Sequence, residues 1–274
     1  MTDFKSEYIP GQGLQVILSA HDKTMMRYGT QRILEWVPSA DNSFLLTDDA
    51  FIRRYKQLHD FQTSDSEAKR RILKDAKGCM AFAHFGTNTV MFKEAASNGK
   101  FSLLEQSAAH EELHLWCKRD RIDPEPHSYY VNEQFIDYLA LRALGLMDVP
   151  LSLVPEELHN HIANAMVTHE ILDALGDSAD KLLFDVCQGK NQEELQGRLN
   201  AYYNQGPPVN DRLQVVHGND FYGRFKDLAL ITRIISMDPE FNYRPGVQEM
   251  SAMMLQWISS RKNIHHLSRS DLSL

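Results

Sequence analysis

The sequence has few cysteines and no long hydrophobic run, and both features restrict where the protein can work. Its three cysteines, Cys79, Cys117 and Cys187, are too few for a disulfide framework, and an odd number cannot all pair within the chain. This favours a reducing compartment. No run of 18 apolar residues occurs, so we expect no transmembrane helix. The first residues also lack a basic segment followed by an apolar one, so we expect synthesis without a Sec signal. These features predict a cytoplasmic protein, or one exported by another route.

The basic residues are scattered rather than clustered, and the net charge is −8. This pattern argues against a nucleic acid or an anionic membrane as the main partner. A hydrophobic content of 43% and a charged content of 24% are ordinary for a globular protein. The 274 residues are enough for one large domain or two lobes.

The most informative motif is H-E-x-x-H at residues 110–114. On a helix, residues four apart lie on one face, so His110 and His114 can direct two imidazoles at one metal ion, with Glu111 beside them. Glu133 follows 19 residues after His114, where a second helix can bring a carboxylate to the same ion. Two histidines and a glutamate with an open fourth position are the arrangement of catalytic zinc, so we predict a Zn²⁺ site.

Residues 110–114, Glu133 and Asp137 together resemble the active site of the gluzincins, the metallopeptidase group that includes the thermolysin and aminopeptidase N types. The resemblance covers about 30 residues, and it concerns the site rather than the whole chain. It implies that the two motif histidines and Glu133 bind zinc and that Glu111 is the general base. It also implies that Asp137, one turn after Glu133, orients a zinc-binding histidine.

The expected reaction needs several groups with distinct roles. Zinc lowers the pKa of its bound water to about 7, and Glu111 would take the water proton and deliver it to the leaving amine. The developing oxyanion needs a further hydrogen-bond donor. Candidates are Tyr129 and Tyr130, between the two expected helices, and His217 with Tyr222. In thermolysin-like enzymes a histidine of the C-terminal lobe has this role, and His217 stands in a similar glycine-flanked loop.

Two other residues compete with Glu133 as the third ligand. Asp120, six residues after His114, matches the metzincin spacing, but Cys117 replaces the glycine at which that helix breaks. His127 lies in a proline-rich loop. We rank Glu133 first, Asp120 second and His127 third.

Two alternative functions come from other classes of protein. The order of acids and E-x-x-H pairs is compatible with a ferritin-like di-iron carboxylate bundle that acts as an oxidase or oxygenase. Its ligands would be Glu94 or Glu105, Glu111, His114, Glu133, Glu156 and His159. Against it, Pro155 puts Glu156 in the first turn of a helix, where acids are common anyway. The other alternative is a helical binding protein without a metal.

Apolar spacing predicts helices over residues 102–119 and 131–146. We also expect helices over the charged stretch 49–77 and over 156–176, 178–204, 223–237 and 246–260, with proline-containing turns between some of them. Two apolar runs, 79–85 and 89–92, flank the turn Gly-Thr-Asn and predict a hairpin. Residues 89–92 are our candidate for the sheet-edge strand that holds an extended substrate in zincins, and an ordinary buried hairpin is the alternative. The first 60 residues give no confident element.

The expected fold is therefore α+β. A zincin-like lobe with a small mixed sheet and the active-site helices would span residues 1–150, and a mostly helical lobe would span 151–274. The expected function is a zinc-dependent peptidase that acts on a protein or peptide. Without a leader or pro-segment, its specificity should be narrow, as in an effector. No G-A-M-E-N exopeptidase signature precedes the metal helix, which favours an endopeptidase.

Overall fold

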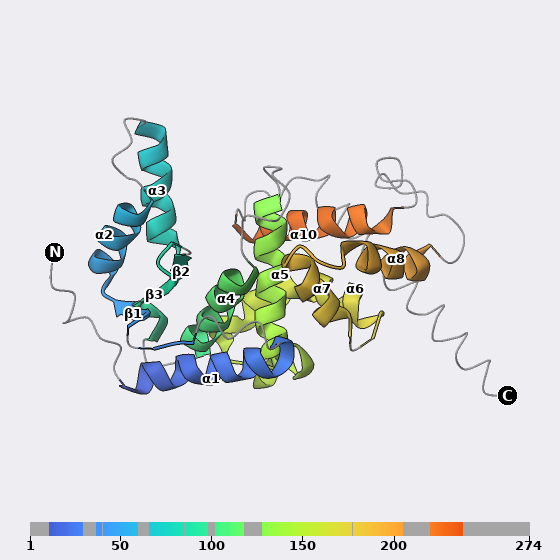
Figure 1. Cartoon of the computed structure of the whole chain (residues 1–274), viewed down its shortest axis with the longest axis horizontal. Coiled ribbons are helices and arrows are strands. Elements are labelled where there is room, and N and C mark those ends of the chain that lie inside the picture. The colour runs from blue at the N-terminus through green and yellow to red at the C-terminus, as the bar shows by residue number, and fades with distance from the viewer. Residues whose placement is uncertain are drawn as a thin grey trace. The chain divides into compact units, whose positions relative to one another are not determined.

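The chain is α+β and mostly helical, and its described residues include a small mixed sheet (Figure 1). The structure is a computed structural model, and it describes residues 11–29, 37–39, 41–59, 66–84, 86–97, 102–117, 128–176, 178–204 and 220–237. Two compact units are present: Met1–Arg119 with Ala143–His159, and Asp120–Arg142 with Asn160–Leu274. The expected division into 1–150 and 151–274 stays a prediction.

The sheet of the first unit contains the predicted hairpin. Strands β2 (Ala81–His84) and β3 (Thr89–Lys93) pair antiparallel, with Ala83 opposite Val90. The turn between them includes Asn88 at a φ of 53°, a left-handed conformation that asparagine tolerates better than most residues. The hairpin prediction is thus confirmed.

Of the two alternatives for residues 89–92, the sheet edge is wrong and the buried hairpin is confirmed. β3 is the central strand of the order β1-β3-β2, because β1 (Ser43–Leu46) pairs parallel to its other side. All five residues of β3 are buried, and both sides of its backbone are paired. The error arose because β1 lies more than 40 residues earlier in the chain, and no local pattern in β3 reveals such a partner.

Two helices pack on this sheet where a single helical stretch was expected. They are α2 (Asp48–Leu58) and α3 (Ser66–Gly78). Phe51 of α2 is fully buried and meets Phe82 edge-on at 5.2 Å between ring centroids. The buried Lys93 of β3 donates from Nζ to the carbonyl oxygen of Lys77 at 2.8 Å, which stabilises the C-terminal end of α3.

The helix that carries the H-E-x-x-H motif packs against a helix that we did not predict from the sequence. Helix α1 (Gly11–Tyr28) packs against α4 (Ser102–Cys117), and α4 also contacts β2. The buried residues Ile17, Ala20, Thr24 and Tyr28 follow a helical period along α1. The same unit contains the short 3-10 helices η1 (Glu94–Ser97), η3 (Leu146–Asp148), η4 (Leu151–Leu153) and η5 (Glu156–Leu158).

The second unit consists of helices in its described part. They are α5 (Ser128–Ala143), α6 (His159–Asp173), α7 (Ala179–Cys187), α8 (Gln192–Tyr203) and α10 (Phe221–Met237). Stacked rings join them: Phe135 with Phe225 at 5.0 Å and Tyr203 with Phe221 at 4.1 Å. The expected helix over 178–204 is two helices, and the one over 246–260 lies outside the described residues.

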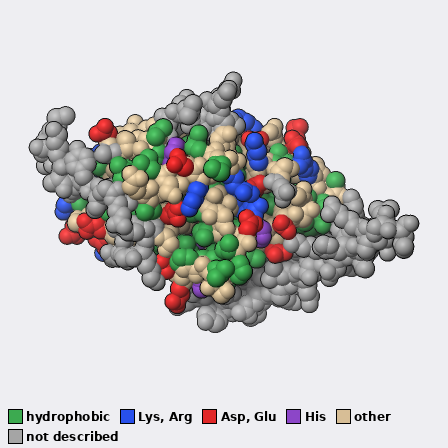
Figure 2. All heavy atoms as spheres, turned by 90° about the horizontal axis from the view of Figure 1, so that it is seen from below, with side chains coloured by type: hydrophobic (Ala, Val, Ile, Leu, Met, Phe, Trp, Pro, Cys, Tyr) green, Lys and Arg blue, Asp and Glu red, His purple; other side chains and the backbone are tan. Residues whose placement is uncertain are grey.

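The charge of the surface and the apolarity of the helices are relevant to binding of nucleic acids and membranes. Figure 2 shows acidic and basic side chains interspersed on the face that it draws. Among the described residues, no helix is both long and apolar enough to cross a membrane.

Candidate metal centre

Helix α4 holds the two motif histidines side by side. Nε2 of His110 and Nε2 of His114 lie 3.0 Å apart, and their rings meet at 71° with centroids 4.7 Å apart. Both residues are half-buried. The surrounding leucines and alanines are good helix formers, and Leu104, Ala109 and Leu113 of the same helix are fully buried. The sequence thus places one imidazole pair on one face, as the spacing predicted.

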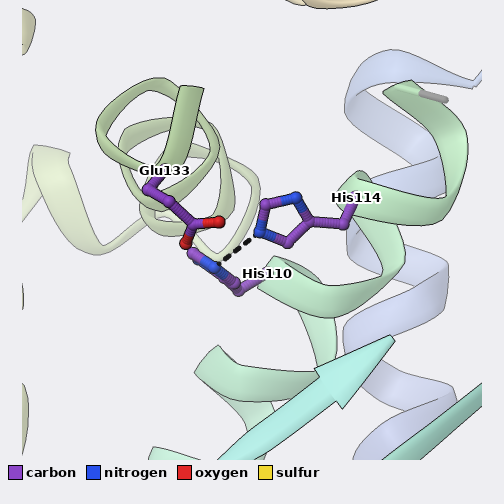
Figure 3. A group of neighbouring side chains, drawn as sticks. All are labelled: His110, His114 and Glu133. Atoms are coloured by element: carbon purple, nitrogen blue, oxygen red, sulfur yellow. Dashed lines mark hydrogen bonds between the residues drawn. The ribbon is translucent and has the colours of Figure 1, made fainter. Parts of the chain in front are cut away.

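Glu133, the predicted third ligand, completes a group with these histidines. It is buried on α5, with 9% of its surface exposed. One ligand atom of each of His110, His114 and Glu133 lies within 4.8 Å of the other two (Figure 3). Among the described residues, no other set of three His, Cys, Asp or Glu side chains forms such a group.

The donor set suits a zinc ion. Two ligands bound at 2.0–2.1 Å and separated by a tetrahedral angle lie about 3.3 Å apart. The 3.0 Å between the imidazole nitrogens is close to that value. Two neutral imidazoles and one carboxylate are also softer than the all-oxygen shells of Mg²⁺ and Ca²⁺.

The two acids inside the motif have different surroundings. Glu111, the expected base, is half-buried and adjacent to His110 in the chain. Glu112 is only 1% exposed, and its Oε1 makes a short hydrogen bond with Nδ1 of His21 on α1. Two residues along a helix correspond to a rotation of about 200°, so Glu112 leaves the helix opposite His110. Glu111 therefore stays the candidate base, whereas Glu112 has a structural role.

The buried pair has coupled ionisation. Burial lowers the pKa of His21, but the hydrogen bond and charge of Glu112 outweigh it and raise the pKa above its usual value. Burial raises the pKa of Glu112, against the opposing effect of His21. The pair therefore retains a proton to higher pH than its separate groups would. Sequence reasoning missed it, because its partners stand 91 residues apart.

Asp137 lies one turn after Glu133 and is 2% exposed. Its Oδ2 is 3.4 Å from Nδ1 of His161 on α6 and 3.7 Å from Nη1 of Arg233 on α10. Nη2 of Arg233 is 3.5 Å from Oε2 of Glu133. The role of Asp137 in orienting a ligand histidine stays a prediction. Sequence reasoning missed Arg233, since nothing local marks it among the residues of an amphipathic helix.

Several predicted site residues lie outside the described part of the chain: His217, Asp120, His127 and the side chains of Tyr129 and Tyr130. Tyr222, the other oxyanion candidate, is buried near the start of α10, and Nζ of Lys226 lies 5.2 Å from its ring centroid.

The di-iron alternative stays a prediction, and the surroundings of three of its expected ligands are as follows. Glu156 and Glu94 are exposed, and Nε2 of His159 is 3.0 Å from the carbonyl oxygen of Val154, to which it donates.

Comparisons with protein-family models, with curated proteins and with solved structures found no match to this chain.

Proposed function

We propose that this protein is a zinc-dependent peptidase. The observation that carries the proposal is the grouping of His110, His114 and Glu133, which joins the two histidines of an H-E-x-x-H helix to a carboxylate from another helix. Three protein ligands of this kind leave a fourth position for water or substrate, which is typical of catalytic rather than structural zinc.

Each residue of the site would have one role. His110 and His114 would hold the ion through imidazole nitrogens, and Glu133 through a carboxylate oxygen. When bound, zinc supplies a Lewis acid and lowers the pKa of coordinated water. The carboxylate of Glu111 accepts the proton of the attacking water and passes it to the leaving amine nitrogen, a contribution of about 10²–10⁴-fold in rate.

The substrate would be a protein or peptide, cleaved within its chain and bound in extended form. Because β3 is central, a substrate that pairs with the described sheet would use β1 or β2. β2 packs against α4, the helix that carries the motif. We therefore favour β2 as the strand beside which the substrate backbone binds.

The decisive test of the reaction is Glu111→Gln, which keeps the ligands and removes the base. Lysate proteins are incubated with wild-type or variant protein, each with matched zinc content, and new N-termini are mapped by mass spectrometry. Glu105→Gln is the control, since Glu105 lies on the same helix and pairs with Lys23 at 2.6 Å. We expect new N-termini from wild type and Glu105→Gln but not from Glu111→Gln. Identical maps from wild type and Glu111→Gln, across lysates from several sources, would overturn the proposal.

The third ligand is tested separately by zinc affinity. Glu133→Ala should weaken zinc binding more than Asp120→Ala, and the reverse order would move the site to the metzincin type. Two irons per chain would support the di-iron alternative instead, and purified protein with no metal would support the binding protein.

A further inference from the structure

Glu133 and Asp137 are two buried acids on one face of α5, and this arrangement needs a counter-charge. Their exposed fractions are 9% and 2%. Carboxylates four residues apart on a helix repel each other, and the repulsion is stronger where water is excluded. The position of Glu133 as a metal ligand therefore depends on the positive group that contacts its carboxylate.

Arg233 of α10 supplies that group and contacts both acids. Its Nη2 lies 3.5 Å from Oε2 of Glu133, and its Nη1 lies 3.7 Å from Oδ2 of Asp137. A planar guanidinium can serve two carboxylates at once in this way, one from each terminal nitrogen, whereas a lysine is a single point charge. The Arg233 side chain is 21% exposed, so the two ion pairs are partly shielded from water.

We propose that Arg233 is a positioning residue of the metal centre, and this inference rests on the proposed function. Its contact with Glu133 uses Oε2, and a monodentate metal ligand needs only one carboxylate oxygen. The guanidinium therefore restrains the rotation of the carboxylate while the residue serves as a ligand. The contact of the same guanidinium with Asp137 offsets the negative charge of that residue. Repulsion between the two carboxylates therefore does not push Glu133 out of position.

Two opposite effects on zinc affinity must be compared. A guanidinium near a divalent cation repels it, so repulsion alone predicts tighter zinc binding when Arg233 is removed. Positioning predicts weaker binding, and loss of an outer partner of a metal ligand typically costs 10–100-fold in affinity. We expect positioning to dominate, because the charge of Arg233 is already opposed by two carboxylates.

The test is the zinc dissociation constant of the full chain, measured by competition with a chromophoric chelator. Arg233→Gln should weaken zinc binding by about 10–100-fold. Arg233→Lys should show a smaller loss, because its ammonium keeps the charge but cannot bridge both acids. Arg142→Gln is the matched control: Arg142 lies on α5, is 11% exposed in its side chain and pairs with Asp180 at 3.9 Å. It should bind zinc as the wild type does.

A double-mutant cycle separates positioning from general damage to the fold. In a Glu133→Gln background, Arg233→Gln should change zinc affinity by no more than about twofold, because the group that Arg233 positions is already altered. Equal losses in both backgrounds would indicate a merely structural role and would overturn the inference. If Arg233→Gln binds zinc as tightly as the wild type or more tightly, the positioning role of Arg233 is overturned but the proposed function is not. If the wild-type chain binds no zinc, both are overturned.

Discussion

Removing His21 should destabilise the protein in a strongly pH-dependent way. In His21→Leu, Glu112 stays in a site that is 1% exposed and loses the hydrogen bond that His21 provides. A buried carboxylate without a counter-charge avoids the cost of desolvating its charge by binding a proton. The variant therefore carries a protonated Glu112 in the folded state and an ionised one in the unfolded state.

The magnitude follows from the pKa of an ordinary glutamate, 4.5. Binding the proton costs about 0.8 kcal/mol at pH 5 and about 2.7 kcal/mol at pH 6.5. The pKa of Glu112 is raised in the folded variant. The variant therefore keeps its full stability below pH 4.5, the pKa of the unfolded glutamate, and loses stability as the pH rises above that value. In the wild type the folded pair holds one proton, whereas the unfolded histidine, with a pKa of 6.5, holds one at pH 5 but only half of one at pH 6.5, which costs the wild type about 0.4 kcal/mol. The deficit of the variant should therefore grow by about 1.5 kcal/mol from pH 5 to pH 6.5.

Urea unfolding followed by circular dichroism, at both pH values and with a chelator present, measures this deficit. The control is His21→Leu with Glu112→Leu, which removes both charges and should stay near the wild type with little pH dependence. A deficit of the single variant that is equal at pH 5 and pH 6.5 would refute the reasoning.

Three further predictions concern stability, each measured by urea unfolding. Phe51→Ala should cost about 3–5 kcal/mol, since Phe51 is fully buried against Phe82; a loss below about 1 kcal/mol would contradict this. Tyr203→Phe should cost about 1 kcal/mol, because the hydroxyl donates to the carbonyl oxygen of Ile171 at 2.9 Å, and unchanged stability would argue against that bond. Thr47→Ala should cost about 1 kcal/mol, because the Thr47 side chain accepts from the Ala50 amide at the start of α2. Thr47→Ser should retain the cap, and a serine variant as unstable as the alanine one would exclude capping.

The helices that carry the proposed ligands were predictable because their signals are local. Apolar spacing and the prolines between them predicted helices over 102–119 and 131–146, and the structure has α4 at Ser102–Cys117 and α5 at Ser128–Ala143. Residues four apart on one helix share a face whatever the rest of the fold does. For that reason the side-by-side placement of His110 and His114 also followed from the sequence.

The features that sequence reasoning missed depend on contacts between distant parts of the chain. α1 begins with Gly-Gln-Gly, which is a turn signal, and its first apolar residues, 14 and 16–18, give no clear helical period, so its packing on α4 selects the helix. The bond between His21 and Glu112 spans 91 residues. The contact of Arg233 with Glu133 and the pairing of β1 with β3 are equally non-local. A single sequence carries no periodic signal for such pairs.

The zinc content of the purified protein tests the central claim most directly. The full chain is prepared without added metal, and zinc per chain is measured by elemental analysis for the wild type and for His114→Ala, with His169→Ala as a histidine control on α6. We predict one zinc per chain in the wild type and in His169→Ala, and none in His114→Ala. Zinc that remains in His114→Ala at the wild-type level would contradict the metal centre.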